Sequence, residues 1–224
     1  MEEINKVHCL FEQSGTFKNK FKEFGIQAID YDIENRFNET DVIIDIFNEI
    51  DVCYDGRASI FDGFGKEDLI MAFFPCTRFE NQIALWFRGD SVSQKKWSMT
   101  QKLDYCIKLE EERSKFYGLI SKLVNICLDR GLKLIIENPY SEQHYLTRYW
   151  CVKPQIVDYD RTQSGDYYKK PTQYWFINCE PKCNLNKDFY WVTEERKIVG
   201  DEHGIDRSLI SPYYVENFIK SYIL

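Results

Sequence analysis

Short apolar runs that end in acidic, glycine or proline residues recur along the first 140 residues of the chain. Runs of this length are typical of buried strands. Between the runs, the apolar residues recur at the spacing of a helix. Alternation of strand and helix predicts parallel β–α–β units. The sequence therefore predicts an α/β protein with a doubly wound, mostly parallel sheet.

The expected strands cover residues 7–11, 26–30, 42–45, 69–74, 132–136 and 173–177. A long amphipathic helix is expected over residues 101–130, with an apolar face made of Leu103, Ile107, Phe116, Ile120, Leu123 and Cys127. Gly25 and Gly131 follow helical stretches and should end them, because glycine adopts the left-handed closing conformation at little cost. A terminal helix is expected over residues 212–223.

The alternation weakens after residue 140, and no linker interrupts the chain. We expect a single domain over residues 1–224, with a cofactor-binding and catalytic core over 1–140 and a reduced C-terminal part over 141–224. No apolar run approaches the roughly 18 residues of a membrane span, and the first residues do not resemble a signal peptide.

Charge and cysteine usage narrow the class of protein further. The formal net charge of −7 disfavours tight, autonomous binding to duplex DNA, which usually requires a basic surface. Eight scattered cysteines are typical of reduced thiols in a cytosol, so we expect a cytoplasmic protein. The spacing of Cys179, Cys183 and His203 is a poor match to a zinc site because a fourth ligand is not evident, and we expect no metal.

Cys76 follows an apolar run and a proline, with Arg78 two residues later. A thiol held at the end of a strand near a cation could have a lowered pKa and act as a nucleophile. A buried cysteine without chemistry would leave the same pattern.

Glu137 also follows an apolar run and precedes Asn138 and Pro139. A carboxylate at this position needs a reason, because acidic residues are rarely buried without a partner. It is either a functional acid or a cap for a following helix. Pro139 predicts that strand pairing stops here and that the chain turns.

Together, a thiolate and a carboxylic acid on neighbouring strand ends suit attack on an electron-poor pyrimidine. The Cys76 thiolate would add to C6 of cytosine while protonated Glu137 donates a hydrogen bond at N3. C5 then becomes nucleophilic enough to take a methyl group. Partial burial of Glu137 would keep it protonated near neutral pH.

Several segments in this order resemble the DNA cytosine-C5 methyltransferases, and most closely their small phage- and prophage-associated members that lack a separate target-recognition domain. The matching segments are residues 10–17 (Leu-Phe-Glu-Gln-Ser-Gly-Thr-Phe), 30–32 (Asp-Tyr-Asp), 45–46 (Asp-Ile), 74–77 (Phe-Pro-Cys-Thr), 136–139 (Ile-Glu-Asn-Pro), 170–176 (Lys-Pro-Thr-Gln-Tyr-Trp-Phe) and 207–212 (Arg-Ser-Leu-Ile-Ser-Pro). The resemblance implies a class I methyltransferase fold, S-adenosylmethionine as cofactor and cytosine in DNA as substrate.

The resemblance also implies roles for individual residues. Cys76 would be the nucleophile and Glu137 the N3 partner, with Asn138 beside them. The loop around Gly15 would wrap the methionine part of the cofactor. The implied cofactor-binding residues are Phe11, Ser14, Gly15, Thr16, Asp30, Asp32, Asp45 and Pro75. Among these, Asp30 or Asp32 would hold the ribose hydroxyls, and Asp45 would contact the adenine amino group. Arg78, Arg161 and Lys170 would contact phosphates or bases, unless they are solvated surface charges.

The chain departs from the family pattern in its first motif and in its size. The family has an acidic residue where Cys9 stands and a glycine where Gln13 stands, and a side chain at Gln13 would obstruct close approach of the backbone to the cofactor. The residues after Glu137 are too few for a recognition domain. This favours relaxed specificity, a partner subunit, or a smaller substrate such as single-stranded DNA or a cytosine nucleotide, for which base extrusion costs little.

Two aromatic stretches, over residues 79–97 and 145–168, lie among basic residues. They suit either base stacking along a single strand or a hydrophobic lid over the sheet. A second function class stays open: a catalytically inactive methyltransferase-fold protein that binds a nucleotide in phage–host conflict. A nicotinamide-dependent reductase is disfavoured because no Gly-x-Gly-x-x-Gly follows the first strand.

Overall fold

The computed structural model describes residues 4–184 and 209–224, and its strands form one sheet with the order β3-β2-β1-β4-β5-β7-β6. The strands are β1 (Lys6–Leu10), β2 (Gln27–Asp32), β3 (Val42–Ile43), β4 (Leu69–Ala72), β5 (Lys133–Pro139), β6 (Ile156–Asp158) and β7 (Thr172–Ile177). All run in one direction except β7, which is antiparallel to both of its neighbours. The α/β class and the mostly parallel sheet are therefore confirmed.

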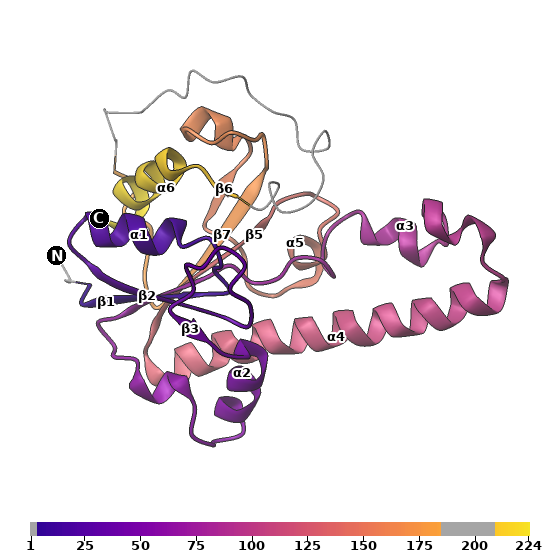
Figure 1. Ribbon diagram of the computed structural model, residues 1–224, viewed down its shortest axis with the longest axis horizontal. Coiled ribbons are helices and arrows are strands. Elements are labelled where there is room, and N and C mark those ends of the chain that lie inside the picture. The colour runs from indigo at the N-terminus through magenta and orange to yellow at the C-terminus, as the bar shows by residue number, and fades with distance from the viewer. Residues whose placement is uncertain (1–3, 185–208) are drawn as a thin grey trace.

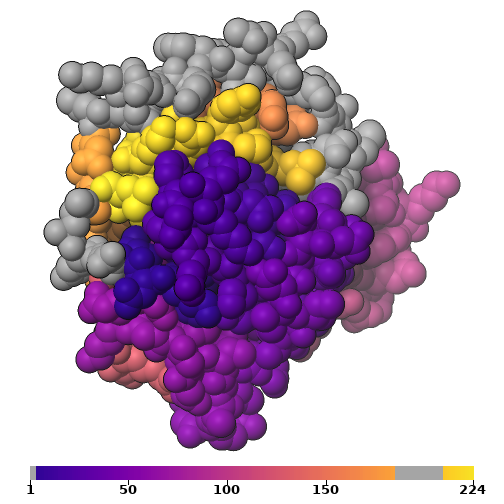
Figure 2. Space-filling model, turned by 60° about the vertical axis from the view of Figure 1, so that its left-hand side comes forward, coloured from indigo at the N-terminus to yellow at the C-terminus, as the bar shows by residue number. Residues whose placement is uncertain are grey.

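Helices cover both faces of this sheet, because alternate residues of the central strands are apolar on each side. Leu10 and Ile70 belong to the core layer that contains α2 (Ile46–Tyr54) and α4 (Met99–Arg130). Val7 and Met71 belong to the opposite layer, with α1 (Thr16–Glu23) and α6 (Pro212–Phe218). Figure 1 shows the two layers, and Figure 2 shows the C-terminal segment packed beside the N-terminal one.

Both expected glycine helix ends are present. Gly25 has φ +79° and Gly131 has φ +68°, the left-handed conformation that an L side chain rarely adopts. The amide of Ile26 donates to the carbonyl of Phe21 at 3.0 Å, which closes α1. The terminal helix is also confirmed, with a final π-helical turn over Ile219–Ile223.

The long helix is confirmed, and its apolar residues are buried in its second half but exposed in its first half. Ile120 and Leu123 are fully buried, whereas Leu103 is 56% and Ile107 60% exposed. At 1.5 Å per residue, this helix of 32 residues is about 48 Å long. The seven-residue strand β5 is only about 23 Å long at about 3.3 Å per residue. Its N-terminal half therefore extends away from the body as an arm (Figure 1).

The aromatic residues of the arm form no lid over the sheet. Trp86, at α3 (Ile83–Phe87), and Trp97 pack on Tyr105 of α4, with ring centroids 5.6 and 5.3 Å apart. In the second aromatic stretch, which includes α5 (Tyr145–Tyr149), Trp150 is buried against Trp175 of β7. These rings are therefore partly committed to packing and do not form one continuous exposed surface.

Pro139 does not stop strand pairing, contrary to the sequence-based expectation. β5 continues through Glu137 and Asn138, which lie opposite Tyr174 and Gln173 of β7. Pro139 occupies the last position of the strand, where the missing amide costs the ladder least. The correction matters for the site, because Glu137 and Asn138 are held by sheet pairing on one side and by the end of β4 on the other.

Among the described residues, no helix has the length and apolar character that a membrane crossing requires. The eight cysteines are free, with Cys9, Cys53 and Cys127 buried. His203 lies outside the described residues, as do Arg207 and Ser208. Within residues 4–184 and 209–224, no three His, Cys, Asp or Glu side chains are grouped so that they could hold a metal ion.

The two halves of α4 should respond differently to the same substitution. Ile120→Ala should lower the free energy of unfolding by about 2–5 kcal/mol because it leaves a cavity in the core. Ile107→Ala on the arm should change it by less than about 0.5 kcal/mol. Urea denaturation of both variants measures the difference, and equal losses would show that the arm is packed against the body.

Candidate active site

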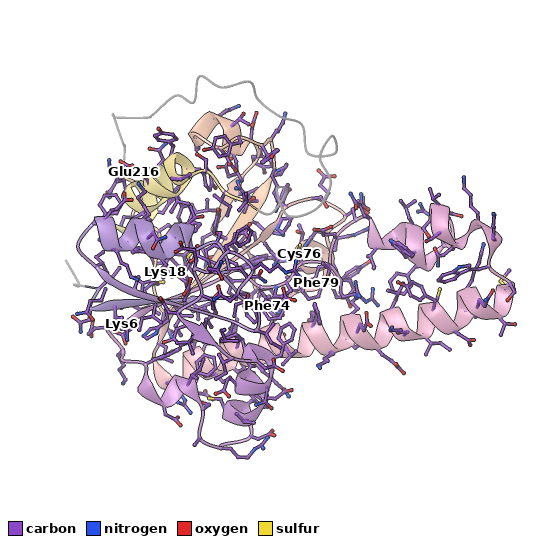
Figure 3. All side chains as sticks on the ribbon, viewed as in Figure 1. Lys6, Lys18, Phe74, Cys76, Phe79 and Glu216 are labelled. Atoms are coloured by element: carbon purple, nitrogen blue, oxygen red, sulfur yellow. The ribbon has the colours of Figure 1, made fainter. Side chains whose placement is uncertain are left out.

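A cavity of about 510 Å³ lies at the carboxyl ends of the central parallel strands, where ligands bind in open α/β sheets. Its walls come from the loop after β1, the loop after β2, the ends of β4 and β5, and the segments before β7 and α6. The lining residues are Phe11, Glu12, Gln13, Ser14, Thr16, Phe17, Arg36, Phe37, Phe73, Phe74, Pro75, Cys76, Thr77, Glu137, Pro139, Lys170 and Ile210. Figure 3 shows Cys76 beside Phe74 and Phe79, near the base of the arm.

Cys76 and Glu137 line this cavity together, as expected for neighbouring strand ends. The surroundings of Cys76 do not lower the pKa of its thiol, however. Burial and then the Glu80 carboxylate raise the pKa of the thiol well above its usual range, although Lys170 acts in the opposite direction. Arg78 does not assist, because its Nε atom donates to Glu112 at 2.6 Å.

Asn138 is fully buried and does not line the cavity. Its Nδ2 atom donates to the carbonyl oxygen of Phe74 at 2.6 Å and to that of Glu137 at 3.1 Å. These bonds tie the segment that carries Cys76 to the strand that carries Glu137. The expected catalytic Asn138 is thus placed as a positioning residue in this structure.

The loop between β1 and α1 has a tightly constrained backbone. Phe11 has φ +61°, unusual for a large side chain, and its amide donates to the carbonyl of Tyr31 at 2.8 Å. Gly15 has φ +66°, and a Cβ atom there would lie 3.0 Å from Glu39 Oε2. Strained backbone of this kind clusters at ligand sites. The sequence motif around Gly15 therefore forms a shaped wall of the cavity.

Glu12 holds this loop in place and was missed in the sequence analysis. Its two carboxylate oxygens accept hydrogen bonds from the amides of Phe17 at 2.7 Å and Lys18 at 3.2 Å. They cap a helix whose N-cap residue, Gly15, has no side chain to do so. Burial raises the pKa of Glu12 to about 7, although the two amide donors act to lower it. The spacing of the two residues in the sequence, with an acid three positions before the glycine that starts the helix, could have identified this role of Glu12.

The three acids expected at the cofactor lie outside the cavity lining. Asp30 is fully buried and pairs with Lys18 Nζ at 3.1 Å. Asp45 is exposed and caps α2 through the amide of Phe47 at 3.0 Å. Asp32 lies closest to the cavity wall, since its Oδ1 atom accepts a bond from Gln13 Nε2 at 3.2 Å.

Of the three expected substrate-binding cations, the structure brings Lys170 to the cavity. Arg161 is 1% exposed, pairs with Asp166, and lies over the ring of Tyr214 at 4.7 Å. Its guanidinium is therefore part of a buried cluster that joins the segment before β7 to α6. Arg36, an exposed residue in the loop after β2, also lines the cavity. No sequence motif pointed to it.

Cys76, Glu137, Lys170, Pro75 and most of the Gly15 loop thus share one cavity, whereas Asp30, Asp45, Arg78 and Arg161 are engaged elsewhere. No protein-family model matches the chain, and no curated protein matches it. The arrangement of side chains around the cavity is therefore the basis for assigning a function.

The pKa of Glu12 predicts a pH-dependent stability. Because its folded pKa, about 7, exceeds the ordinary value of 4.5, the folded protein binds the extra proton between these values. Glu12 therefore favours the fold fully below about pH 4.5, and this contribution is lost as the pH rises through about 7. Glu12→Gln should thus have a higher melting temperature relative to wild type at pH 8 than at pH 5.

Thermal unfolding at the two pH values measures this difference, with Glu39→Gln as a control near the same helix end. Glu39 is 43% exposed, so its variant should shift by the same amount at both pH values. A shift for Glu12→Gln that does not depend on pH would contradict the assignment.

Proposed function

We propose that this protein is an S-adenosylmethionine-dependent methyltransferase that acts on C5 of cytosine in DNA. The observation that carries the proposal is that Cys76 and Glu137 line the same cavity as the loop around Gly15. The sheet, with one antiparallel strand near its edge, is compatible with a class I methyltransferase fold. The resemblance of the motif segments to small cytosine-C5 methyltransferases supports the same conclusion.

The cavity is suited to the methyl donor in size and lining. Its volume of about 510 Å³ falls in the range of small-molecule sites, roughly 300–1,000 Å³. The buried Glu12 carboxylate and the hydroxyls of Ser14 and Thr16 suit the charged methionine part, and Phe11 and Phe37 suit the adenine ring. S-Adenosylmethionine would supply an electrophilic methyl group there.

The residues of the chain account for the activation of cytosine. Cys76 Sγ bonds to C6, and Glu137 donates a proton toward N3, so that the electron pair of the C5–C6 double bond becomes available at C5. Asn138 keeps the two groups on adjacent strand ends. Lys170 lies near Cys76 and provides positive charge for a phosphate or for the base.

The charge of the chain favours a small or single-stranded substrate. The net charge of −7 disfavours a strong grip on duplex DNA. We therefore include single-stranded DNA, a cytosine nucleotide and a duplex presented by a partner subunit among the substrates to test, in a cytoplasmic setting.

Cys76→Ala should lower methyl transfer by at least about 1,000-fold, because the covalent route to C5 is lost. Binding of S-adenosylmethionine should change little. Transfer of a labelled methyl group to cytosine-containing single strands, duplexes and nucleotides measures the first effect, and calorimetry measures the second. Cys151→Ala, at an exposed cysteine, is the matched control. A Cys76→Ala variant with wild-type activity would refute the assignment.

One observation favours a second candidate, a nucleotide-binding protein with this fold but without the chemistry. The Gln13 side chain lines the cavity and donates a hydrogen bond to Asp32, the acid expected to hold the ribose hydroxyls. A cofactor would have to displace that bond.

Thermal unfolding separates the two candidates. S-Adenosylmethionine at 100 times its dissociation constant should raise the free energy of unfolding by about 2.7 kcal/mol. Gln13→Gly should strengthen binding of the donor, because it frees Asp32. Stabilisation by cytosine nucleotides but not by S-adenosylmethionine, in both proteins, would favour the second candidate.

A further inference from the structure

The hydrogen-bond partner of the Cys76 thiol is Glu80, a residue that the motif segments do not include. Cys76 Sγ donates to Glu80 Oε1 at 2.7 Å. The two residues are four positions apart in a helical turn, in which the amide of Glu80 donates to the carbonyl of Cys76 at 3.2 Å. Side chains four residues apart lie on one face of such a turn.

The turn is fixed by the residue before Glu80. Phe79 is 1% exposed, and its ring stacks on Phe74 at 6.3 Å and on Tyr145 at 6.2 Å between centroids. Since Phe79 is anchored in the core, the direction of its neighbour Glu80 is constrained as well. The contact between thiol and carboxylate is thus supported by packing on both sides of the cysteine segment.

The proposed reaction requires the Cys76 thiol to lose its proton, since the thiolate is the nucleophile. The charged groups that act on the thiol are Glu80, Lys170 and Glu137. A lysine ammonium has no lone pair to accept the proton, and Glu137 is needed as the donor at N3. Glu80 is the remaining acceptor, and it already accepts the hydrogen bond that the thiol donates.

We propose that Glu80 is the general base that removes the thiol proton as Cys76 attacks C6 of cytosine. This inference rests on the proposed function. The proton moves from Sγ to Glu80 Oε1, and the electron pair of the S–H bond forms the bond between Sγ and C6. The π pair of the C5–C6 bond shifts toward C5 and the ring, where Glu137 supplies the proton at N3. After C5 is methylated, the proton on C5 leaves to solvent, and its electron pair re-forms the C5–C6 double bond as the bond between Sγ and C6 breaks. The proton on Glu80 then returns to Sγ, and the proton at N3 returns to Glu137.

Two carboxylates beside one thiol then have opposite roles, since Glu80 accepts a proton while Glu137 donates one. The Glu80 carboxylate also disfavours the thiolate, because two negative charges would lie side by side. The thiol therefore stays protonated and unreactive until a cytosine is bound. Removal of the Glu80 charge should therefore affect resting reactivity and turnover in opposite directions.

Glu80→Gln tests this prediction with two readouts. Alkylation of Cys76 by iodoacetamide, quantified on the Cys76 peptide by mass spectrometry without any cofactor, should become about 3–10 times faster at pH 8 as thiolate becomes easier to form. Methyl transfer should fall by about 100-fold or more, the usual loss when a general base is removed. Between pH 7 and 9 the rate of transfer by the variant should rise about tenfold per pH unit, because hydroxide must now remove the proton.

Glu111→Gln, an exposed residue of α4, is the control and should leave both rates within about twofold of wild type. Transfer by Glu80→Gln at the wild-type rate would overturn the role of Glu80 and leave the proposed function intact. A parallel fall in alkylation and transfer would also overturn it, because that result indicates a structural role. A wild-type protein that binds S-adenosylmethionine but methylates no cytosine substrate would overturn the proposed function, and the role of Glu80 with it.

Discussion

The side-chain amide of Asn138 connects the two strands on which the candidate chemistry depends. Its Nδ2 atom donates to the carbonyl oxygens of Phe74 and Glu137, inside the core and away from water. A buried hydrogen bond of this kind is expensive to lose, because the orphaned carbonyl would stay desolvated. The bond therefore fixes the cysteine segment relative to the acid, and the cavity takes its shape from that arrangement.

Three acidic side chains lie in or next to the cavity. Glu12 closes the loop after β1, Glu80 binds the thiol, and Glu137 faces the cavity from β5. Two cationic side chains, Lys170 and Arg36, also line the cavity. The proposed chemistry uses the two carboxylates nearest the thiol in different protonation states, with Glu80 as the proton acceptor and Glu137 as the proton donor.

Much of this arrangement could be predicted from the sequence, for a simple geometric reason. Parallel strands end at one edge of the sheet, so motifs that follow strands in the sequence come together in space. This reasoning places Cys76, Glu137 and the Gly15 loop around one cavity. The glycine ends of α1 and α4 could be predicted for a different reason, because they depend on local backbone conformation alone.

The remaining features depend on partners that are distant in sequence. Arg161 is neutralised by Asp166 and covered by Tyr214, which no local pattern reveals. The apolar face of α4 is buried only where the sheet lies beneath it, so Leu103 and Ile107 are exposed despite their periodicity. The direction of β7 allows β5 to continue through Pro139. Burial and then the Glu80 contact raise the pKa of Cys76, whereas the nearby Arg78 in the sequence had predicted a lowered pKa.

The most direct test of the central claim is a covalent trap on cytosine. A single-stranded oligonucleotide in which C5 of one cytosine carries fluorine can accept the methyl group, but it cannot release fluorine as a proton is released. The bond between Sγ and C6 would therefore persist. The account predicts a denaturation-resistant adduct that forms only with S-adenosylmethionine present and that peptide mapping places on Cys76. An absence of adduct while S-adenosylmethionine and the oligonucleotide are both bound would contradict it.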